Sequence, residues 1–286
     1  MSSELELKHV SANGIRFAYH EAGAGNGPLV LCLHGFPDTA QSYAQLLPAL
    51  ATAGYRAVAP YMRGYAPTGL APDGDYSAPA LGRDVLALIE ALGAKNADVI
   101  GHDWGAYAAY CAANLDAVPA RIRRLVLMSV PHIGGAVQSL KQLRRSWYIW
   151  FFQLSGLPER RVARDNYAFI DRLYRAWSPS WPVTEAAMRP VKQALAAPGG
   201  LAAAIGYYRA MFRGSNRQSW ALLAAKMRCE RTTVFRALRK AEALGVVAVV
   251  PHESRNGRQE EHEYRIDWQR LATMEKLHAK RPAPRA

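Results

Sequence analysis

The side chain best placed to do chemistry is that of Asp103, at the centre of the stretch Gly101-His102-Asp103-Trp104-Gly105. The residues before it predict a short buried strand, and a helix is predicted from Trp104. The flanking glycines let the chain turn sharply, so the carboxylate stands exposed at the carboxyl end of a parallel sheet. The N–H groups and dipole at the start of the helix stabilise negative charge there. The stretch has the form of a nucleophile elbow with aspartate in place of serine, although these five residues alone are better explained by an ordinary strand-to-helix turn.

A second motif reverses that interpretation. It is the run His34-Gly35-Phe36-Pro37-Asp38. It directly follows a continuous apolar run at positions 29–33, which predicts a strand covered on both faces of a sheet. Both motifs therefore follow buried strands, and the carboxyl edge of the sheet is where the functional site of such a fold lies.

The elements that must position these motifs alternate between strands and helices. Strands are predicted at 4–10, 15–21, 29–33, 55–59, 98–100 and 125–130, and helices at 42–53, 80–92 and 104–115. The first two strands form a hairpin around the turn Asn13-Gly14. Strands that alternate with helices predict an α/β fold with a doubly wound, mostly parallel sheet.

Together the two motifs, in this order and separated by two βα units, resemble the α/β-hydrolase superfamily, specifically its epoxide hydrolase and haloalkane dehalogenase branch. The resemblance covers residues 4–213 and implies a core at 1–132 and a helical cap at 133–213. It implies that Asp103 attacks an electrophilic carbon to give an alkyl-enzyme ester, with the N–H groups of Phe36 and Trp104 as oxyanion hole. His34 and His102 would support backbone geometry. The implied substrate is a small apolar epoxide or haloalkane, with no cofactor and no metal.

The aromatic-rich helices predicted at 146–157, 161–177, 184–197 and 200–212 fit the cap. By resemblance, Tyr208 is the cap tyrosine that donates a proton to the epoxide oxygen. We align the site of its partner tyrosine with Phe151, which has no donor, although Tyr148 lies one turn away on the same helix face. The resemblance also implies that the indole of Trp104 would hold a leaving halide, so haloalkane dehalogenase activity stays an alternative.

The sequence departs from the family after the cap. The family has two further strands, one followed by an acid and the other by a histidine that activates water, and we find neither. The first carboxylate after the strand ending at Val130 is Glu159. His252 is the one candidate base that we retain, but no acid-bearing strand precedes it, and the interpretation as a wing histidine is favoured. We therefore expect at most a single turnover.

Residues 214–270 resemble a winged helix-turn-helix module, and 271–286 form a basic tail. Two helices are predicted at 218–226 and 231–244, followed by strands at 246–250 and 263–268. The module implies duplex DNA as a partner, read by the second helix and held by the wing. The candidate DNA contacts are Arg231, Thr232, Thr233, Arg236, Arg239, Lys240, Arg255 and Arg258.

The charge distribution agrees with a basic C-terminal part. Of the net charge of +13, residues 213–286 contribute 16 Lys and Arg against 8 Asp and Glu. Three widely spaced cysteines make a disulfide framework or zinc site improbable. The absence of an apolar leader or membrane-length segment predicts a soluble cytoplasmic protein without a membrane partner. Three interpretations stay open: a hydrolase, a DNA-binding protein with a non-catalytic hydrolase-like scaffold, and a fusion without selected function.

Overall fold

A computed structural model of the protein describes residues 5–115, 121–130, 146–212, 247–250 and 263–266. Its main sheet consists of β1 (Leu7–Ala12), β2 (Ile15–Ala22), β3 (Leu29–Leu33), β4 (Arg56–Pro60), β5 (Ala97–His102) and β6 (Ile122–Met128). The strand order is β1-β2-β4-β3-β5-β6. The pairs β1/β2 and β2/β4 are antiparallel, whereas β4, β3, β5 and β6 run parallel to one another. The predicted α/β fold is confirmed, with a mixed sheet.

The predicted hairpin joins β1 to β2 through Asn13 and Gly14, which adopt φ angles of 46° and 73°. Such positive angles at both central residues are those of the turn that suits twisted antiparallel strands. All five residues of β3 are buried, as its continuous apolar run predicts. A surface position for His20 on β2 was also expected from the sequence, and this was wrong: His20 is buried, with its Nε2 3.2 Å from the Tyr61 hydroxyl.

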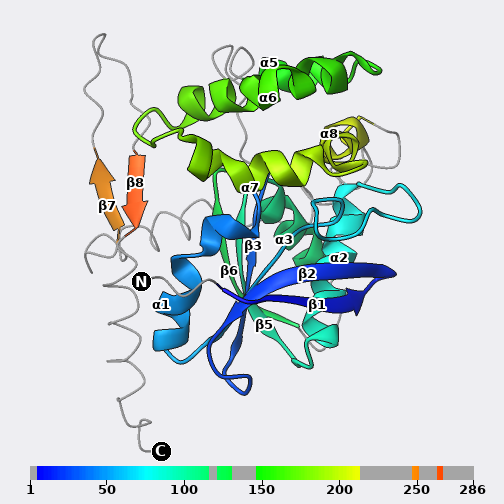
Figure 1. Ribbon diagram of the computed structural model, residues 1–286. Helices are drawn as coiled ribbons and strands as arrows, with labels where there is room; N and C mark the ends of the chain where they lie inside the picture. The colour runs from blue at the N-terminus through cyan, green and yellow to red at the C-terminus, as the bar shows by residue number, and fades with distance from the viewer. Residues whose placement is uncertain (1–4, 116–120, 131–145, 213–246, 251–262, 267–286) are drawn as a thin grey trace, which may run out of the picture.

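Helices cover both faces of the sheet. The short helix η1 (Ala40–Tyr43) and α1 (Leu46–Thr52) lie on one side, and α2 (Ala78–Ala91) and α3 (Trp104–Leu115) lie on the other (Figure 1). The helix predicted over 42–53 is thus broken in two. α2 and α3 approach closely at Gly82, where a Cβ would stand 2.8 Å from the backbone nitrogen of Ala112. The sheet is therefore covered by helices on both faces, and α3 follows β5 after a single residue, Asp103.

The cap consists of α5 (Trp147–Phe151), α6 (Leu157–Trp177), α7 (Glu185–Ala196) and α8 (Gly200–Ala210). These helices lie above the carboxyl ends of the parallel strands (Figure 1). The single helix expected over 146–157 was wrong, because α5 already ends at Phe151 and a separate helix, α6, begins after Gly156, which adopts a left-handed φ of 67°. α6 also contains four non-helical residues, Arg164 to Tyr167, and is therefore kinked.

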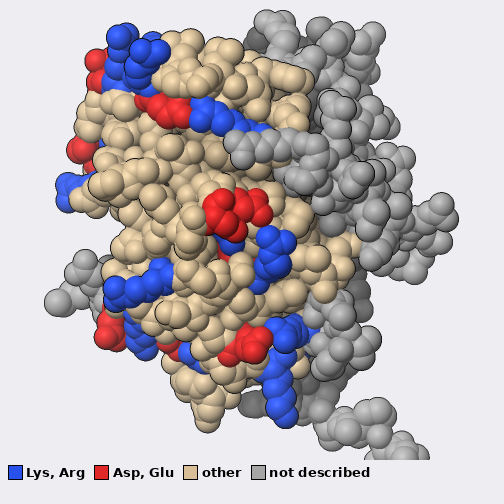
Figure 2. Space-filling model, turned by 90° about the vertical axis from the view of Figure 1, so that its right-hand side faces the viewer, with Lys and Arg blue, Asp and Glu red and all other residues tan. Residues whose placement is uncertain are grey.

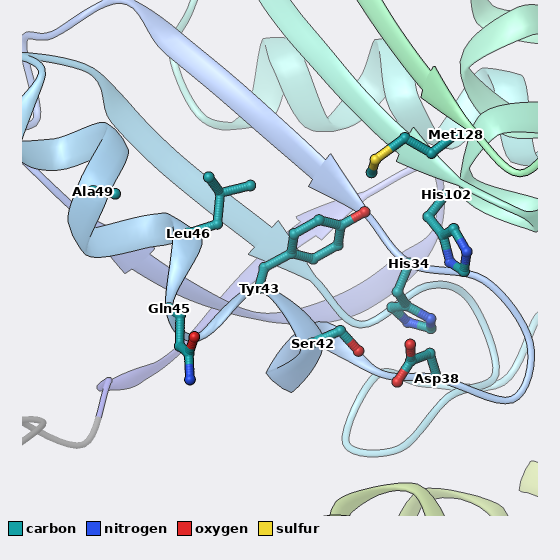
Figure 3. Close-up of a pocket in the computed structure, with 9 residues that line it drawn as sticks. All are labelled: His34, Asp38, Ser42, Tyr43, Gln45, Leu46, Ala49, His102 and Met128. Atoms are coloured by element: carbon teal, nitrogen blue, oxygen red, sulfur yellow. The ribbon is translucent and has the colours of Figure 1, made fainter. Parts of the chain in front are cut away.

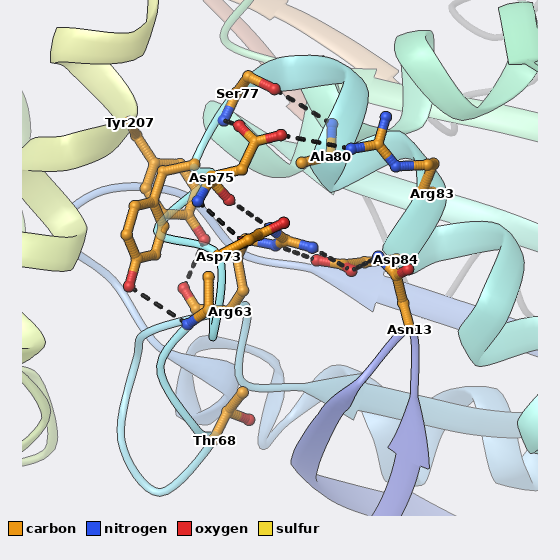
Figure 4. A network of polar contacts seen from close by, with 12 residues as sticks. Asn13, Arg63, Thr68, Asp73, Asp75, Ser77, Ala80, Arg83, Asp84 and Tyr207 are labelled. Carbon is orange, nitrogen blue, oxygen red and sulfur yellow. Dashed lines mark hydrogen bonds and ion pairs between the residues drawn. The ribbon is translucent and has the colours of Figure 1, made fainter.

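Two tyrosine hydroxyls join the cap to the core. Tyr174 of α6 donates to Asp38 Oδ1 at 3.0 Å, and Tyr207 of α8 donates to the carbonyl of Arg63 at 2.7 Å. Arg63 is itself buried and pairs with Asp84 of α2, with Nη2 2.6 Å from Oδ1 (Figure 4). Asn13 donates to the same carboxylate oxygen at 2.7 Å. The cap therefore rests on a loop that a buried ion pair holds in place.

The C-terminal part of the chain contributes two described strands, β7 (Val247–Val250) and β8 (Glu263–Ile266). They pair with each other in antiparallel fashion, in a sheet separate from the main one. Within the described residues the main sheet therefore ends at β6. The two strands agree with the predicted hairpin, but both predicted helices of the winged module and the basic tail lie outside the described residues, so the module stays a prediction.

One face of the molecule is shown in Figure 2. On it, groups of Lys and Arg lie beside groups of Asp and Glu on a surface that is mainly uncharged. Exposed ion pairs such as Arg83 with Asp75 and Arg121 with Glu90 belong to the described surface. The described part of this face is thus of mixed charge. None of the described helices is long and apolar enough to span a membrane.

Candidate active site

The turn between β5 and α3 consists of one residue, Asp103. Its φ of 51° lies in the left-handed region, which is uncommon for a residue with a side chain. The backbone fixes this conformation: the Asp103 N–H donates to Met128 O at 3.2 Å, and its carbonyl accepts from Tyr107 N at 3.1 Å. Such strain persists only where the surroundings impose it, and it concentrates at functional sites.

The predicted need for small residues around this turn is met in the structure. A Cβ on Gly101 would stand 2.6 Å from the carbonyl oxygen of Gly105. A Cβ on Gly105 would collide with the backbone of Leu33 at the end of β3. The turn can therefore pack against its neighbours only because both positions are glycine.

The carboxylate of Asp103 meets the second motif directly. Phe36 N–H donates to Asp103 Oδ1 at 2.8 Å, and a Cβ on Gly35 would lie 2.8 Å from Asp103 Cγ. Burial raises the pKa of Asp103, and hydrogen bonds from the N–H groups of Phe36 and Trp104 lower it, with a net rise. The structure thus brings together Asp103 and the two backbone donors named from the sequence.

His34 fills a structural role. Its Nδ1 donates to Gly35 O at 3.0 Å, and its Nε2 accepts from Met62 N–H at 3.0 Å. Burial lowers the pKa of His34 to about 4, so the ring is neutral near pH 7. With both ring nitrogens engaged, this histidine holds the loop containing Gly35 and Pro37 and is not available as a base.

Aromatic rings from the cap close over Asp103. Tyr208 of α8 lies 5.2 Å from both Phe36 and Trp104, measured between ring centroids, and 5.7 Å from Tyr148 of α5. Burial raises the pKa of Tyr208 well above 10, and the Asp103 carboxylate adds to the rise. The same two causes, burial and the Asp103 charge, raise the pKa of Tyr148. Both phenols therefore stay protonated and can donate.

The structure places Tyr148, and not Phe151, against Tyr208, whereas the sequence aligned Phe151 with the site of the partner tyrosine. Phe151 instead packs against Phe152 and Phe169, within the cap. Tyr148 and Phe151 are three residues apart on one helix face, so the helical period made both compatible with the sequence pattern. The signal that favours Tyr148 is its hydroxyl, because only a donor can complete the pair.

A cavity of about 610 Å³ opens beside the same turn, on the side of α1. His34, Asp38 and His102 lie at one end of it with Met128, and Leu46 and Ala49 of α1 lie toward the other (Figure 3). Ser42, Tyr43 and Gln45 complete the described lining. Asp38 and His102, named from the motifs, are thus brought together at a cavity that the sequence did not predict.

The remaining sequence-based candidates divide into two groups. Glu159 pairs with Arg209, with Oε2 3.1 Å from Nη2, and supports the cap rather than the site. Outside the described residues lie His252, Arg231, Thr232, Thr233, Arg236, Arg239, Lys240, Arg255 and Arg258. In the described part of the chain, no three His, Cys, Asp or Glu side chains gather as a metal site would require.

Comparisons with known proteins agree with this arrangement. A family model described as alpha/beta hydrolase fold matches residues 28–170. The chain is 32% identical over 217 residues to the AB hydrolase superfamily protein YfhM of Bacillus subtilis, covering 74% of this chain and 75% of that protein. It is 34% identical over 178 residues to Epoxide hydrolase A of Mycobacterium tuberculosis, covering 59% of this chain. The chain spans only about half, 54%, of the length of that enzyme.

Solved structures give the same result. The crystal structure of epoxide hydrolase VrEH1 from Vigna radiata matches with a TM-score of 0.63 and 28% identity, covering 79% of this chain and 76% of that one. Epoxide Hydrolase A from Mycobacterium thermoresistibile matches with a TM-score of 0.62 and 28% identity, covering 78% and 79%.

Proposed function

The chain belongs to the α/β-hydrolase fold family, and from this premise we propose that it opens small apolar epoxides, with Asp103 as the nucleophile. The observation that carries the proposal is the position of the Asp103 carboxylate. It sits on a strained turn, receives the Phe36 N–H at 2.8 Å, and is close enough to Tyr148 and Tyr208 for its charge to raise the pKa of both phenols. The names of the similar epoxide hydrolases support this substrate class.

In the first step, the free carboxylate oxygen of Asp103 attacks an epoxide carbon, and the bond between that carbon and the epoxide oxygen breaks. The oxygen leaves as an alkoxide, which takes a proton from Tyr208 or Tyr148. The product is an alkyl ester on Asp103 with a neutral hydroxyl group. A carboxylate suits displacement at a saturated carbon, and the paired phenols supply the proton that the leaving oxygen requires.

Epoxides fit the site better than alkyl halides. A leaving halide would need the indole N–H of Trp104, but the ring of Tyr208 lies edge-on against this indole, with the ring centroids 5.2 Å apart. The indole therefore packs against the phenol that would serve an epoxide oxygen. Alkyl halides therefore remain the second substrate class within the same mechanism.

The second step, hydrolysis of the ester, needs a base that deprotonates water. His34 is excluded because both ring nitrogens are engaged. His252 lies outside the described residues, and Glu159 is paired with Arg209. We therefore propose that the ester forms once and persists, which limits the chain to a single turnover.

The test is to measure epoxide consumption across a panel of epoxides and haloalkanes at known enzyme concentration. We expect consumption of one equivalent of epoxide per chain, lost in Asp103→Asn. No consumption of any compound would contradict the proposed activity. Many equivalents consumed, with loss in His252→Gln, would contradict the single turnover and make the C-terminal segment part of the hydrolase.

A second proposal concerns residues 214–270, which we propose bind duplex DNA through a winged helix. The observations that favour it are the separate β7–β8 hairpin and the excess of positive charge after residue 213. We expect binding that weakens steeply as salt rises, since it depends on phosphate contacts. Equal binding by a variant carrying Arg236→Ala and Arg239→Ala would contradict the proposal.

A further inference from the structure

One face of helix α5, together with the turn that follows it, is apolar and exposed. Its side chains, each between 42% and 54% exposed, are those of Trp147, Trp150, Leu154 and Phe212. The Leu154 N–H donates to Phe151 O at 3.2 Å, so the helical path continues to Leu154, and positions 147, 150 and 154 share one side. The Phe212 ring lies 5.2 Å from that of Trp150, measured between centroids. We call these four side chains the α5 face.

The other side of this segment is buried in the cap. Phe152 is fully buried, and Tyr148 packs against Tyr208. A surface helix normally presents polar side chains to water, whereas a helix that is apolar on every side occurs where its whole surface leaves water. Contiguous apolar surface that stays exposed marks an interaction site. The α5 face is therefore expected to bind an apolar partner.

Positive charge without a counter-charge lies at one end of the α5 face. The Arg160 Nε donates to Gly156 O at 3.3 Å, which places this guanidinium beside the turn between α5 and α6. Arg160 and Arg161 are exposed, and neither forms an ion pair within the described residues. The neighbouring acid, Glu159, is already held by Arg209, with Oε1 2.5 Å from Nη1. The partner is therefore expected to carry negative charge as well as apolar groups.

We propose that the α5 face binds the surface of a membrane that contains anionic phospholipid. Tryptophan favours this environment, because its ring enters the acyl chains while the indole N–H stays near the hydrated headgroups. Arginines beside such a face attract anionic headgroups. With five residues, α5 is about 8 Å long and lies on the bilayer rather than across it. This binding is independent of the proposed reaction, and it differs from the expectation of no membrane partner, which concerned a spanning segment.

A second copy of the chain fits the α5 face less well than lipid does. In a two-fold dimer the same patch of each copy meets the other. Each patch would bring Arg160 and Arg161, while the neighbouring Glu159 is already paired with Arg209. Anionic headgroups supply the negative charge that a second copy of this patch does not.

Vesicle sedimentation with the full chain tests the proposal. Vesicles of phosphatidylcholine and phosphatidylserine in equal amounts are compared with vesicles of phosphatidylcholine alone. We expect binding to the mixed vesicles, weakened at least about tenfold by Trp147→Ser with Trp150→Ser, because two large apolar side chains no longer enter the lipid. Arg160→Ser with Arg161→Ser should weaken it by about tenfold at low salt. No binding of the unchanged chain to the mixed vesicles would overturn the inference.

The matched control separates the α5 face from other attractive surfaces. The part after residue 213 is basic and is expected to attract anionic lipid by charge alone, but it is the same in every variant. Leu154→Ser should weaken binding, whereas Leu115→Ser, at the end of α3, should not, although the two leucines are 48% and 45% exposed. Equal binding by these two variants, or by the double tryptophan variant and the unchanged chain, would overturn the inference.

The oligomeric state distinguishes lipid from a second copy. Without vesicles, we expect sedimentation velocity to give the same mass for the unchanged chain and the double tryptophan variant. A dimer that the variant loses, together with no binding to vesicles, would overturn the inference and assign the α5 face to a second copy. Either result leaves the reaction at Asp103 unaffected, so this inference and the proposed function fail separately.

Discussion

The two sides of Asp103 differ in what they offer to a reaction. On the cap side, Tyr148, Tyr208 and Trp104 form a closed aromatic surface with hydroxyl donors. On the α1 side, Asp38 and His102 face an open cavity whose described walls contain no cap residue. Under the proposed function, ester formation depends on the cap side, where the phenols can donate a proton. The difference teaches that the described residues bring hydroxyl donors to one side of Asp103 and an open cavity to the other.

The largest expected effect comes from replacing Asp103, the residue that lies between the two sides. Asp103→Asn should slow epoxide consumption by about 10⁴-fold or more, as loss of a nucleophile does in other enzymes. The amide has nearly the shape of the carboxylate, so the fold should be retained, as thermal unfolding would show. A variant that still consumes one equivalent of epoxide would place the nucleophile elsewhere.

The buried ion pair between Arg63 and Asp84, which supports the cap, can be removed without changing a residue on the α1 side. Asp84→Asn leaves the buried Arg63 without its counter-charge, and we expect a loss of about 3–5 kcal/mol in the free energy of unfolding. The matched control is Arg83→Met, which breaks the exposed pair with Asp75 and should cost less than about 1 kcal/mol. Denaturant unfolding of both variants measures the difference. Equal costs would show that the buried pair does not hold the loop under Tyr207.

Replacing Tyr148 or Tyr208 should change the rate of one reaction step only, the formation of the ester. Tyr208→Phe and Tyr148→Phe should each slow ester formation from an epoxide by about 10²- to 10³-fold, because a donor to the developing alkoxide is lost. Neither should change the rate at which ester that has already formed is lost. Tyr167→Phe, in the kinked part of α6, serves as the control. Slower ester loss in the Tyr208 variant would show that the sides are not separate.

The smallest expected effect concerns pH. Burial raises the pKa of Asp103 above its ordinary value of 3.8, and only the ionised carboxylate attacks. Ester formation should therefore be fast above that raised pKa and fall as the pH is lowered through it. The apparent pKa is read from the rate of epoxide consumption at constant ionic strength. An apparent pKa below 3.8 would show that the backbone N–H donors outweigh burial.

Much of this comparison could be predicted from the sequence. The two glycine-flanked motifs predicted Asp103, Phe36 and Trp104 at one sheet edge because short buried strands precede both. The alternation of strands and helices predicted the fold for a similar reason, since apolar periodicity is local. Tyr208 was also placed from its motif.

The rest depends on contacts between distant segments. Phe151 was preferred to Tyr148 because the helical period alone does not distinguish positions three residues apart, and only packing against Tyr208 does. His20 alternates along its strand like a surface residue but is buried beside Tyr61. The cavity depends on how α1 sits beside the ends of β5 and β6, which no local pattern encodes.

The measurement that tests the central claim most directly is the mass of the intact chain after one equivalent of epoxide, followed by peptide mapping of the adduct. The account predicts that the mass of one epoxide is added, that it maps to Asp103, and that it persists without added base. An adduct on another residue, or no adduct while epoxide is consumed, would contradict it.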